Sequence, residues 1–87
     1  MSDRIFVDTN ILVYAHDADA GEKHAAAAQA VADLWESRNG ILSTQVLQEL
    51  YITLTRQVTS PVTGTVARRL IRNYLTWDLV LNDGAIV

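Results

Sequence analysis

The strongest constraint on the fold lies near the N-terminus, where a short hydrophobic run ends at an acid. Ile5, Phe6 and Val7 form a continuous apolar segment of β-branched and aromatic residues, which is typical of a strand buried on both faces of a parallel sheet. Asp8 follows, and short polar residues then change the pattern from strand to a helix over residues 10–16. Ligand sites in open α/β sheets lie at the carboxyl ends of strands, so Asp8 is the first candidate functional residue.

The rest of the chain continues to alternate between strands and helices. Apolar residues spaced three and four apart predict amphipathic helices, and short apolar runs between turn residues predict strands. Strand, helix and strand units cross over in the right-handed sense, which makes successive strands parallel. We therefore predict one α/β domain, a three-layer α/β/α parallel sheet. The helices are expected over residues 10–16, 22–37, 44–57 and 64–76, and further strands over residues 41–43 and 78–81.

Turn residues divide these elements. Residues 38–40 should end the second helix with a left-handed residue, and residues 58–63 contain the only proline and should form a loop. Residues 82–84 are turn residues that should end the last predicted strand, and residues 85–87 would begin another apolar element.

Composition limits the classes of function. The chain has no cysteine, which excludes disulfides and thiolate metal sites and fits a reducing cytoplasm. The residues before the first strand do not have the pattern expected of a signal peptide, and no apolar run is long enough to cross a bilayer. The net charge of −3 offers no general attraction to a nucleic-acid backbone. Contact with RNA would therefore need a local basic patch or a bound metal ion.

A second motif, read together with the first, makes the pattern more specific. Ser43-Thr44-Gln45-Val46-Leu47-Gln48-Glu49-Leu50 follows the strand over residues 41–43, and together with Asp8-Thr9-Asn10-Ile11-Leu12 it resembles the PIN domain family. More narrowly, the two motifs are similar to those of the VapC-type toxins of toxin–antitoxin pairs, over residues 5 to 80. The resemblance implies a metal-dependent endoribonuclease with Mg²⁺ or Mn²⁺ as cofactor, an RNA substrate and a cognate antitoxin protein as partner.

The resemblance also implies which residues act. Asp8 and Glu49 would be the catalytic, metal-binding carboxylates, because hard divalent cations prefer carboxylate oxygens. Both follow parallel strands and would lie over the same sheet edge. Alternative roles remain open from the residues alone: Asp8 as a helix N-cap, and Glu49 as a solvated residue linked to Arg56.

Four neighbouring polar residues would support this pair. Asn10 could hydrogen-bond Asp8 or a metal-bound water. Thr9 is expected to cap the first helix, with its hydroxyl close to the site. Ser43 and Thr44 are expected to cap the third helix, and the alternative is that they support the metal ligands.

The other charged residues have simpler interpretations. The two acids of the loop over residues 17–21 lack the remaining ligands of a calcium loop, so they are interpreted as solvated acids. His24 has no second histidine at ligand spacing and is interpreted as a surface or packing residue. Three arginines of the fourth predicted helix form a solvated face or, alternatively, a phosphate-contacting patch: Arg68, Arg69 and Arg72.

One departure from the family pattern affects the expected activity. PIN domains carry further acidic residues in a later segment, and the sequence ends at Val87 before such a segment. Because each missing ligand weakens metal binding, we expect the 87-residue chain to be a poor nuclease. The alternative is a catalytically inert α/β association module. We also expect self-association, as a homodimer or larger oligomer, because a half-finished sheet leaves an apolar edge uncovered. The alternative is that a C-terminal partner segment covers this edge.

Overall fold

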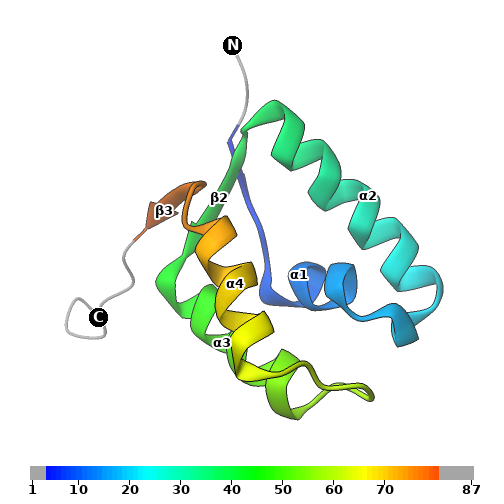
Figure 1. Cartoon of the computed structure of the whole chain (residues 1–87). Coiled ribbons are helices and arrows are strands. Elements are labelled where there is room, and N and C mark those ends of the chain that lie inside the picture. The colour runs from blue at the N-terminus through cyan, green and yellow to red at the C-terminus, as the bar shows by residue number, and fades with distance from the viewer. Residues whose placement is uncertain (1–3, 81–87) are drawn as a thin grey trace.

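The computed structural model describes residues 4–80, in which strands and helices alternate as predicted (Figure 1). In chain order, the elements are β1 (Ile5–Phe6), α1 (Thr9–His16), the 3₁₀ helix η1 (Ala18–Ala20), α2 (Glu22–Ser37), β2 (Gly40–Ser43), α3 (Thr44–Arg56), α4 (Gly64–Tyr74) and β3 (Asp78–Val80). The four predicted α-helices and three predicted strands are confirmed. The predicted elements over residues 82–87 lie outside the described residues.

The three strands form one parallel sheet in the order β1-β2-β3. Ile5 pairs with Gly40, and Leu42 pairs with Leu79. Helices flank this sheet, so the predicted parallel α/β architecture is confirmed. Both crossovers step in the same direction along the sheet, and right-handed crossovers in one direction place their helices on the same face. The helices of residues 4–80 thus form one helical layer on one face of the sheet. The second helical layer of the predicted α/β/α architecture, on the opposite face, stays a prediction.

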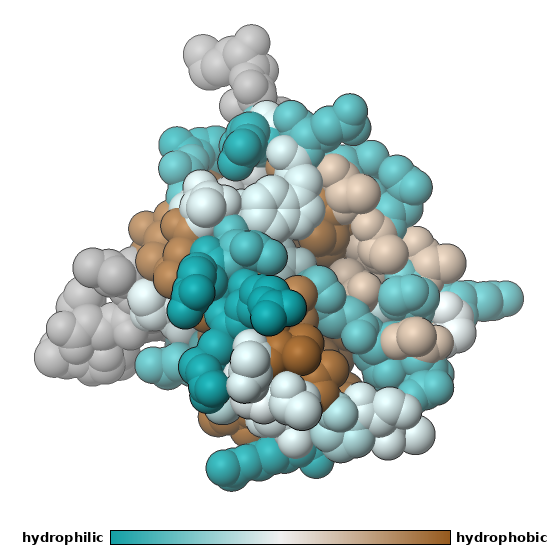
Figure 2. All heavy atoms as spheres, in the orientation of Figure 1, coloured by the Kyte–Doolittle hydropathy of each residue, from teal (hydrophilic) through white to brown (hydrophobic). Residues whose placement is uncertain are grey.

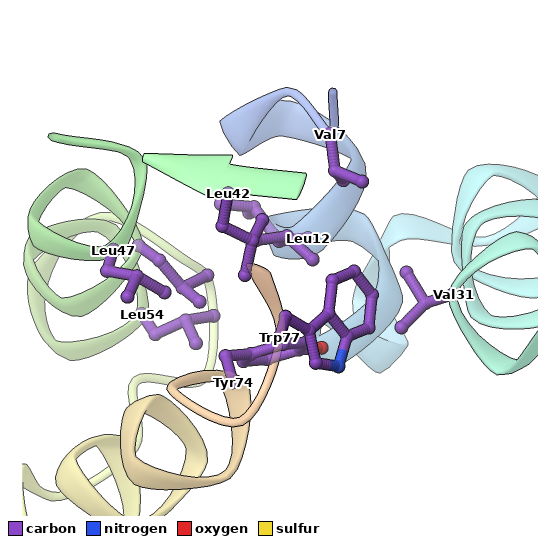
Figure 3. Packing of buried hydrophobic residues seen from close by; sticks show 10 residues of the cluster. Val7, Leu12, Val31, Leu42, Leu47, Leu54, Tyr74 and Trp77 are labelled. Atoms are coloured by element: carbon purple, nitrogen blue, oxygen red, sulfur yellow. The ribbon is translucent and has the colours of Figure 1, made fainter. Parts of the chain in front are cut away.

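Burial along the strands agrees with this arrangement. Val7 and Leu42 are buried in one core with side chains from all four α-helices, and Figure 3 shows this packing. Phe6 points to the other face and is 66% exposed. The prediction that the first strand is buried on both faces is therefore wrong within residues 4–80, because no described helix covers the Phe6 face.

An aromatic cluster joins the second half of the chain to α2. The ring centroids of Trp35 in α2 and Trp77 just before β3 lie 5.0 Å apart, and Tyr74 at the end of α4 lies 5.5 Å from Trp35 and 5.2 Å from Trp77. The Trp77 ring covers the backbone of Gly40, where a Cβ atom would overlap it. This close approach explains why the first residue of β2 is a glycine.

The helix ends follow local sequence. The left-handed end predicted for α2 is confirmed, and it falls on Arg38 (φ 62°, ψ 27°) rather than on a glycine. Thr63 caps α4 by accepting a hydrogen bond from the backbone N–H of Val66. That helix stops at Tyr74, two residues earlier than predicted, because the backbone turns to bring Trp77 into the core. Among residues 4–80, no helix has the length and apolar character needed to span a membrane.

Candidate functional site

Asp8 lies where β1 ends and α1 begins. Its backbone occupies the N-cap position (φ −75°, ψ 150°), and its carbonyl oxygen accepts hydrogen bonds from the N–H groups of Ile11 and Leu12 at 3.2 and 3.4 Å. Its carboxylate makes no capping hydrogen bond, and the residue is exposed. Capping by the Asp8 side chain, one of the two roles considered from sequence, is therefore wrong. The carboxylate at the end of β1 is left open to solvent.

Glu49 lies in the second turn of α3, and both of its carboxylate oxygens accept hydrogen bonds. Thr9 Oγ1 donates to Oε2 at 3.1 Å, and Gln45 Nε2 donates to Oε1 at 3.0 Å. A side chain held at both oxygens loses much of its rotamer freedom, so its position is preset. Glu49 is exposed, as its interpretation as a solvated residue expects, whereas no ion pair joins it to Arg56 within residues 4–80, so the link to Arg56 is wrong.

Thr9 connects the two candidate carboxylates. It is the first residue of α1, directly follows Asp8 and is only 8% exposed. Its hydroxyl donates to Glu49 and does not cap the helix, so the capping role predicted for Thr9 is wrong. The Thr9 hydroxyl was also expected to lie close to the candidate site, and its hydrogen bond shows that it lies next to the Glu49 carboxylate. The start of α1 and the second turn of α3 therefore meet at the same sheet edge.

The remaining supporting residues take mixed roles. Capping by Ser43 is confirmed, since Ser43 Oγ accepts a hydrogen bond from the backbone N–H of Val46 at 3.1 Å. Thr44 is the first residue of α3 and is half-buried, and Asn10 is exposed in the first turn of α1. Support of the candidate carboxylates by Ser43, Thr44 and Asn10 stays a prediction.

The donor atoms at this edge suit a hard divalent cation. Asp8 offers a carboxylate without a capping bond, and Glu49 offers one fixed by two hydrogen bonds. Carboxylate oxygens are the ligands that Mg²⁺ and Mn²⁺ prefer. Within residues 4–80, no group of three or more histidine, aspartate or glutamate side chains comes together. The residue types thus suit part of the coordination sphere of such an ion, and metal binding by Asp8 and Glu49 stays a prediction.

A groove lies beside Asp8, and the sequence alone did not predict it. It has a volume of about 490 Å³ and separates β1 from α2, with these lining residues: Ile5, Phe6, Val7, Asp8, Ile11, Ala30, Asp33, Leu34 and Ser37. Asp33 is a second acid on this groove, where its Oδ1 accepts a hydrogen bond from Gln29 Nε2 at 2.9 Å. Nothing in the local sequence of α2 indicates which of its polar residues faces β1, because that depends on how the helix docks.

The histidines have structural contacts. Nε2 of His16 and the hydroxyl of Tyr74 form a hydrogen bond of 2.6 Å. Burial lowers the pKa of His16, and the charge of His24 lowers it further. Burial also raises the pKa of Tyr74 to about 12. His24 Nδ1 lies 2.9 Å from the carbonyl oxygen of Tyr14, so the interpretation of His24 as a packing residue is confirmed.

The two loop acids also serve local structure. Asp17 Oδ1 accepts a hydrogen bond from the backbone N–H of Asp19 at 3.1 Å and so caps η1. Asp19 Oδ2 accepts one from Ser60 Oγ at 2.8 Å, which ties the loop to the segment between α3 and α4. Asp17 thus lies at a helix start, as its interpretation from the sequence expects.

Comparisons with known proteins support the pairing of the two motifs. The family model described as PIN domain matches residues 5–87, which includes both candidate carboxylates. Searches of curated proteins and of solved structures gave no match. The family match covers nearly the whole sequence and agrees with the parallel sheet and its flanking helices. The chain belongs to the PIN domain family.

Proposed function

We propose that the protein is a metal-dependent endoribonuclease of the VapC toxin type, in which Asp8 and Glu49 bind Mg²⁺ or Mn²⁺. PIN domains are generally nucleases that act on nucleic acid and typically use divalent metal ions. The observation that carries the proposal is the 3.1 Å hydrogen bond from Thr9 to Glu49. It brings the carboxylate of α3 to the residue next to Asp8.

In this proposal, the residues around Asp8 have separate roles in binding and positioning the ion. The Asp8 and Glu49 carboxylates hold the ion, and Thr9 and Gln45 keep Glu49 in position through their hydrogen bonds. Asn10, in the first turn of α1, orients water or the Asp8 carboxylate. The chemistry supplied by the ion is stabilisation of charge at the scissile phosphate and activation of water at neutral pH. Preset ligands favour catalysis because small errors in alignment are costly in rate.

The proposal extends to the partners of the protein. RNA is the substrate, a cognate antitoxin protein is the inhibitor, and the reducing cytoplasm is the compartment, which the absence of cysteine supports.

Self-association as a homodimer would cover the exposed side chains of β1, since Ile5 is 49% and Phe6 is 66% exposed. Sedimentation of the wild type and of Phe6→Glu tests this: a dimer that the substitution dissociates supports it, and a monomeric wild type contradicts it.

Metal binding gives the most direct test of the site. Mn²⁺ affinity is measured by calorimetry for the wild type, Asp8→Asn and Glu49→Gln, with Asp17→Asn as the control acid outside the site. Each of the first two substitutions should weaken Mn²⁺ binding by about tenfold or more, and Asp17→Asn should leave it unchanged. Equal affinities in all four proteins would contradict the assignment.

Cleavage of RNA separates the nuclease from the alternative function. Single-stranded RNA is incubated with the protein and Mn²⁺, with Asp8→Asn beside it. Slow cleavage that depends on Mn²⁺ and disappears in Asp8→Asn supports the proposal, and the rate is expected to be low because residues 4–80 bring together no third carboxylate. An inert association module is favoured instead if Mn²⁺ neither binds nor promotes cleavage.

A further inference from the structure

A pocket lies where the ends of three helices meet, on a different part of the surface from the groove beside Asp8. Its volume is about 350 Å³, and its lining residues are His16, Trp35, Leu70, Asn73, Tyr74 and Thr76. These residues come from the last turns of α1, α2 and α4 and from the turn that follows α4. A pocket of this size accepts a small organic molecule with one ring system.

Three aromatic side chains line this pocket. The rings of Trp35 and Tyr74 are inclined by only 29°, with their centroids 5.5 Å apart, and the His16 ring meets Tyr74 edge-on at 5.7 Å. The hydrogen bond between His16 and the Tyr74 hydroxyl holds these two rings in place. Burial lowers the pKa of His16, so its imidazole is uncharged at neutral pH. Rigid, uncharged aromatic surface favours a flat aromatic ligand.

The polar lining of the pocket includes one carboxamide that is available to a ligand. Asn73 is exposed, and within residues 4–80 its backbone carbonyl accepts a hydrogen bond from the Thr76 hydroxyl whereas its carboxamide makes none. A carboxamide offers an acceptor oxygen and a donor nitrogen side by side in one plane. That pair matches the N6 donor and N7 acceptor of adenine, to which asparagine bonds through both atoms.

A cation adjoins the carboxamide. Arg69 lies one helical turn before Asn73 on α4, so the two side chains are neighbours on the helix surface. Arg69 is exposed and has no ionic or hydrogen-bonding partner within the part of the chain that the structure describes. Figure 2, which faces α4, shows strongly hydrophilic side chains over this helix beside paler residues of intermediate hydropathy. A guanidinium beside a pocket for a base is placed to pair with a phosphate.

From these observations we propose that the pocket binds the adenine base of an adenosine nucleotide. The base lies against the rings of Trp35 and Tyr74, and its N6 and N7 atoms pair with the Asn73 carboxamide. The phosphate pairs with Arg69. This binding site is separate from Asp8 and Glu49 and does not depend on a metal ion.

The chemistry of the lining argues against other occupants. Guanine presents two acceptors, O6 and N7, at the corresponding edge, and one of them would face the acceptor oxygen of Asn73. Pyrimidines lack N7 and offer a smaller surface to the aromatic rings. A carbohydrate needs hydrogen bonds for several hydroxyl groups, and aromatic rings supply most of the surface here. An adenine ring satisfies both the flat apolar lining and the carboxamide.

The adenine base has two sources, a free nucleotide and an unpaired adenosine of an RNA strand, and the experiment separates them. Binding to the 87-residue protein is measured by calorimetry for AMP, GMP, CMP, ribose 5-phosphate and an oligoadenylate of about ten nucleotides. All titrations contain EDTA, so a metal ion at Asp8 cannot contribute. They are repeated at two salt concentrations, because screening weakens contacts between exposed charges.

Two variants remove the proposed contacts, and each has a matched control. Asn73→Ala deletes the carboxamide, with Gln48→Ala as the control because Gln48 is an exposed carboxamide on α3 outside the pocket. Arg69→Ala removes one positive charge, with Arg68→Ala as the control because Arg68 contacts the Thr65 hydroxyl and does not line the pocket. All four substitutions are at exposed positions, and circular dichroism checks that each variant is folded.

The proposal predicts that AMP binds about tenfold or more tightly than GMP or CMP, and that Asn73→Ala removes this preference. Arg69→Ala should weaken AMP binding severalfold at low salt and less at high salt, and both controls should bind AMP as the wild type does. Oligoadenylate that binds more tightly than AMP, with the same loss in Asn73→Ala, identifies RNA as the source of the base. Equal or weaker binding of oligoadenylate identifies the free nucleotide.

Three results would overturn the proposal. These are no binding of AMP at millimolar concentration, equal affinities for AMP, CMP and ribose 5-phosphate, and a preference for AMP that Asn73→Ala leaves unchanged. Binding of Mn²⁺ at Asp8 and cleavage of RNA are measured separately, so failure of this proposal leaves the proposed nuclease function standing, and the reverse also holds.

Discussion

Substituting Gly40 by alanine tests how the sheet and the aromatic cluster fit together. A Cβ atom on Gly40 would overlap Cζ3 and Cε3 of the Trp77 indole and come within 3.2 Å of Cη2. Non-bonded carbon atoms pack at about 3.5 to 4.0 Å. The indole cannot easily move away, because it is 7% exposed and packs edge-on against Trp35 and Tyr74, at centroid distances of 5.0 and 5.2 Å.

The expected magnitude is the difference between two effects. Forcing an extra methyl group into a packed core costs about 1 to 3 kcal/mol. Replacing glycine by alanine where φ is not positive stabilises by about 0.4 to 1 kcal/mol, by reducing the entropy of the unfolded chain, and Gly40 is not among the positive-φ residues. We expect Gly40→Ala to lower the free energy of unfolding by about 1 to 2 kcal/mol. For a domain of this size, this corresponds to a fall of roughly 4 to 16 °C in Tm.

The assay is urea unfolding followed by circular dichroism, in the wild type and in a Trp77→Leu background. In that background the methyl group meets no ring, so Gly40→Ala should become neutral or slightly stabilising. The double-mutant cycle would then give a coupling energy of about 1 to 3 kcal/mol between the two positions. An equal cost of Gly40→Ala in both backgrounds would refute the steric explanation. Trp77→Phe serves as an intermediate background with a smaller ring.

Further substitutions test the candidate site, a helix end and a buried histidine. Thr9→Val should weaken Mn²⁺ binding severalfold, because Glu49 loses one of its positioning hydrogen bonds, whereas Thr9→Ser should retain the affinity; equal calorimetric affinities of the two variants would contradict this role. Arg38→Gly should raise the free energy of unfolding by about 0.5 to 1 kcal/mol in urea titrations, because glycine tolerates the left-handed backbone at this position, and a loss of stability would count against that backbone conformation. The pKa of His16 is lowered in the folded state, so the unfolded chain binds the proton first as pH falls; stability should be full above pH 6.5 and decrease below it. Thermal unfolding as a function of pH should show a weaker decrease in His16→Gln than in His24→Gln, and identical profiles would refute the assignment.

Local sequence was sufficient for most of the fold. The alanine-rich segment from Glu22 to Ser37 has high helix propensity over its whole length, and its helix has those bounds. The parallel sheet followed from the alternation of strands and helices, because crossover handedness leaves few topologies. The exposure of Phe6 could not be predicted in this way. An apolar strand residue does not indicate whether a helix covers its face, and that depends on the direction of each crossover.

The candidate site shows the same division between local and long-range information. Asp8 and Glu49 were predicted from their motifs, and their neighbours were expected to act as caps because capping is a local interaction. Ser43 does cap its helix, whereas the Thr9 hydroxyl bonds to Glu49, 40 residues away in sequence. Asp33 was missed for the same reason. Bonds between distant segments depend on how helices dock, which spacing along one helix does not specify.

The aromatic cluster also determines which part of the structure tryptophan fluorescence monitors. Trp35 and Trp77 are the two tryptophans of the sequence, and their rings are in edge-on contact. Tryptophan fluorescence therefore originates from one location, where α2, the end of α4 and the start of β3 converge. A shift in the emission maximum would indicate that water has reached this junction, and it would register separation of β3 from the helices even where helix content is unchanged.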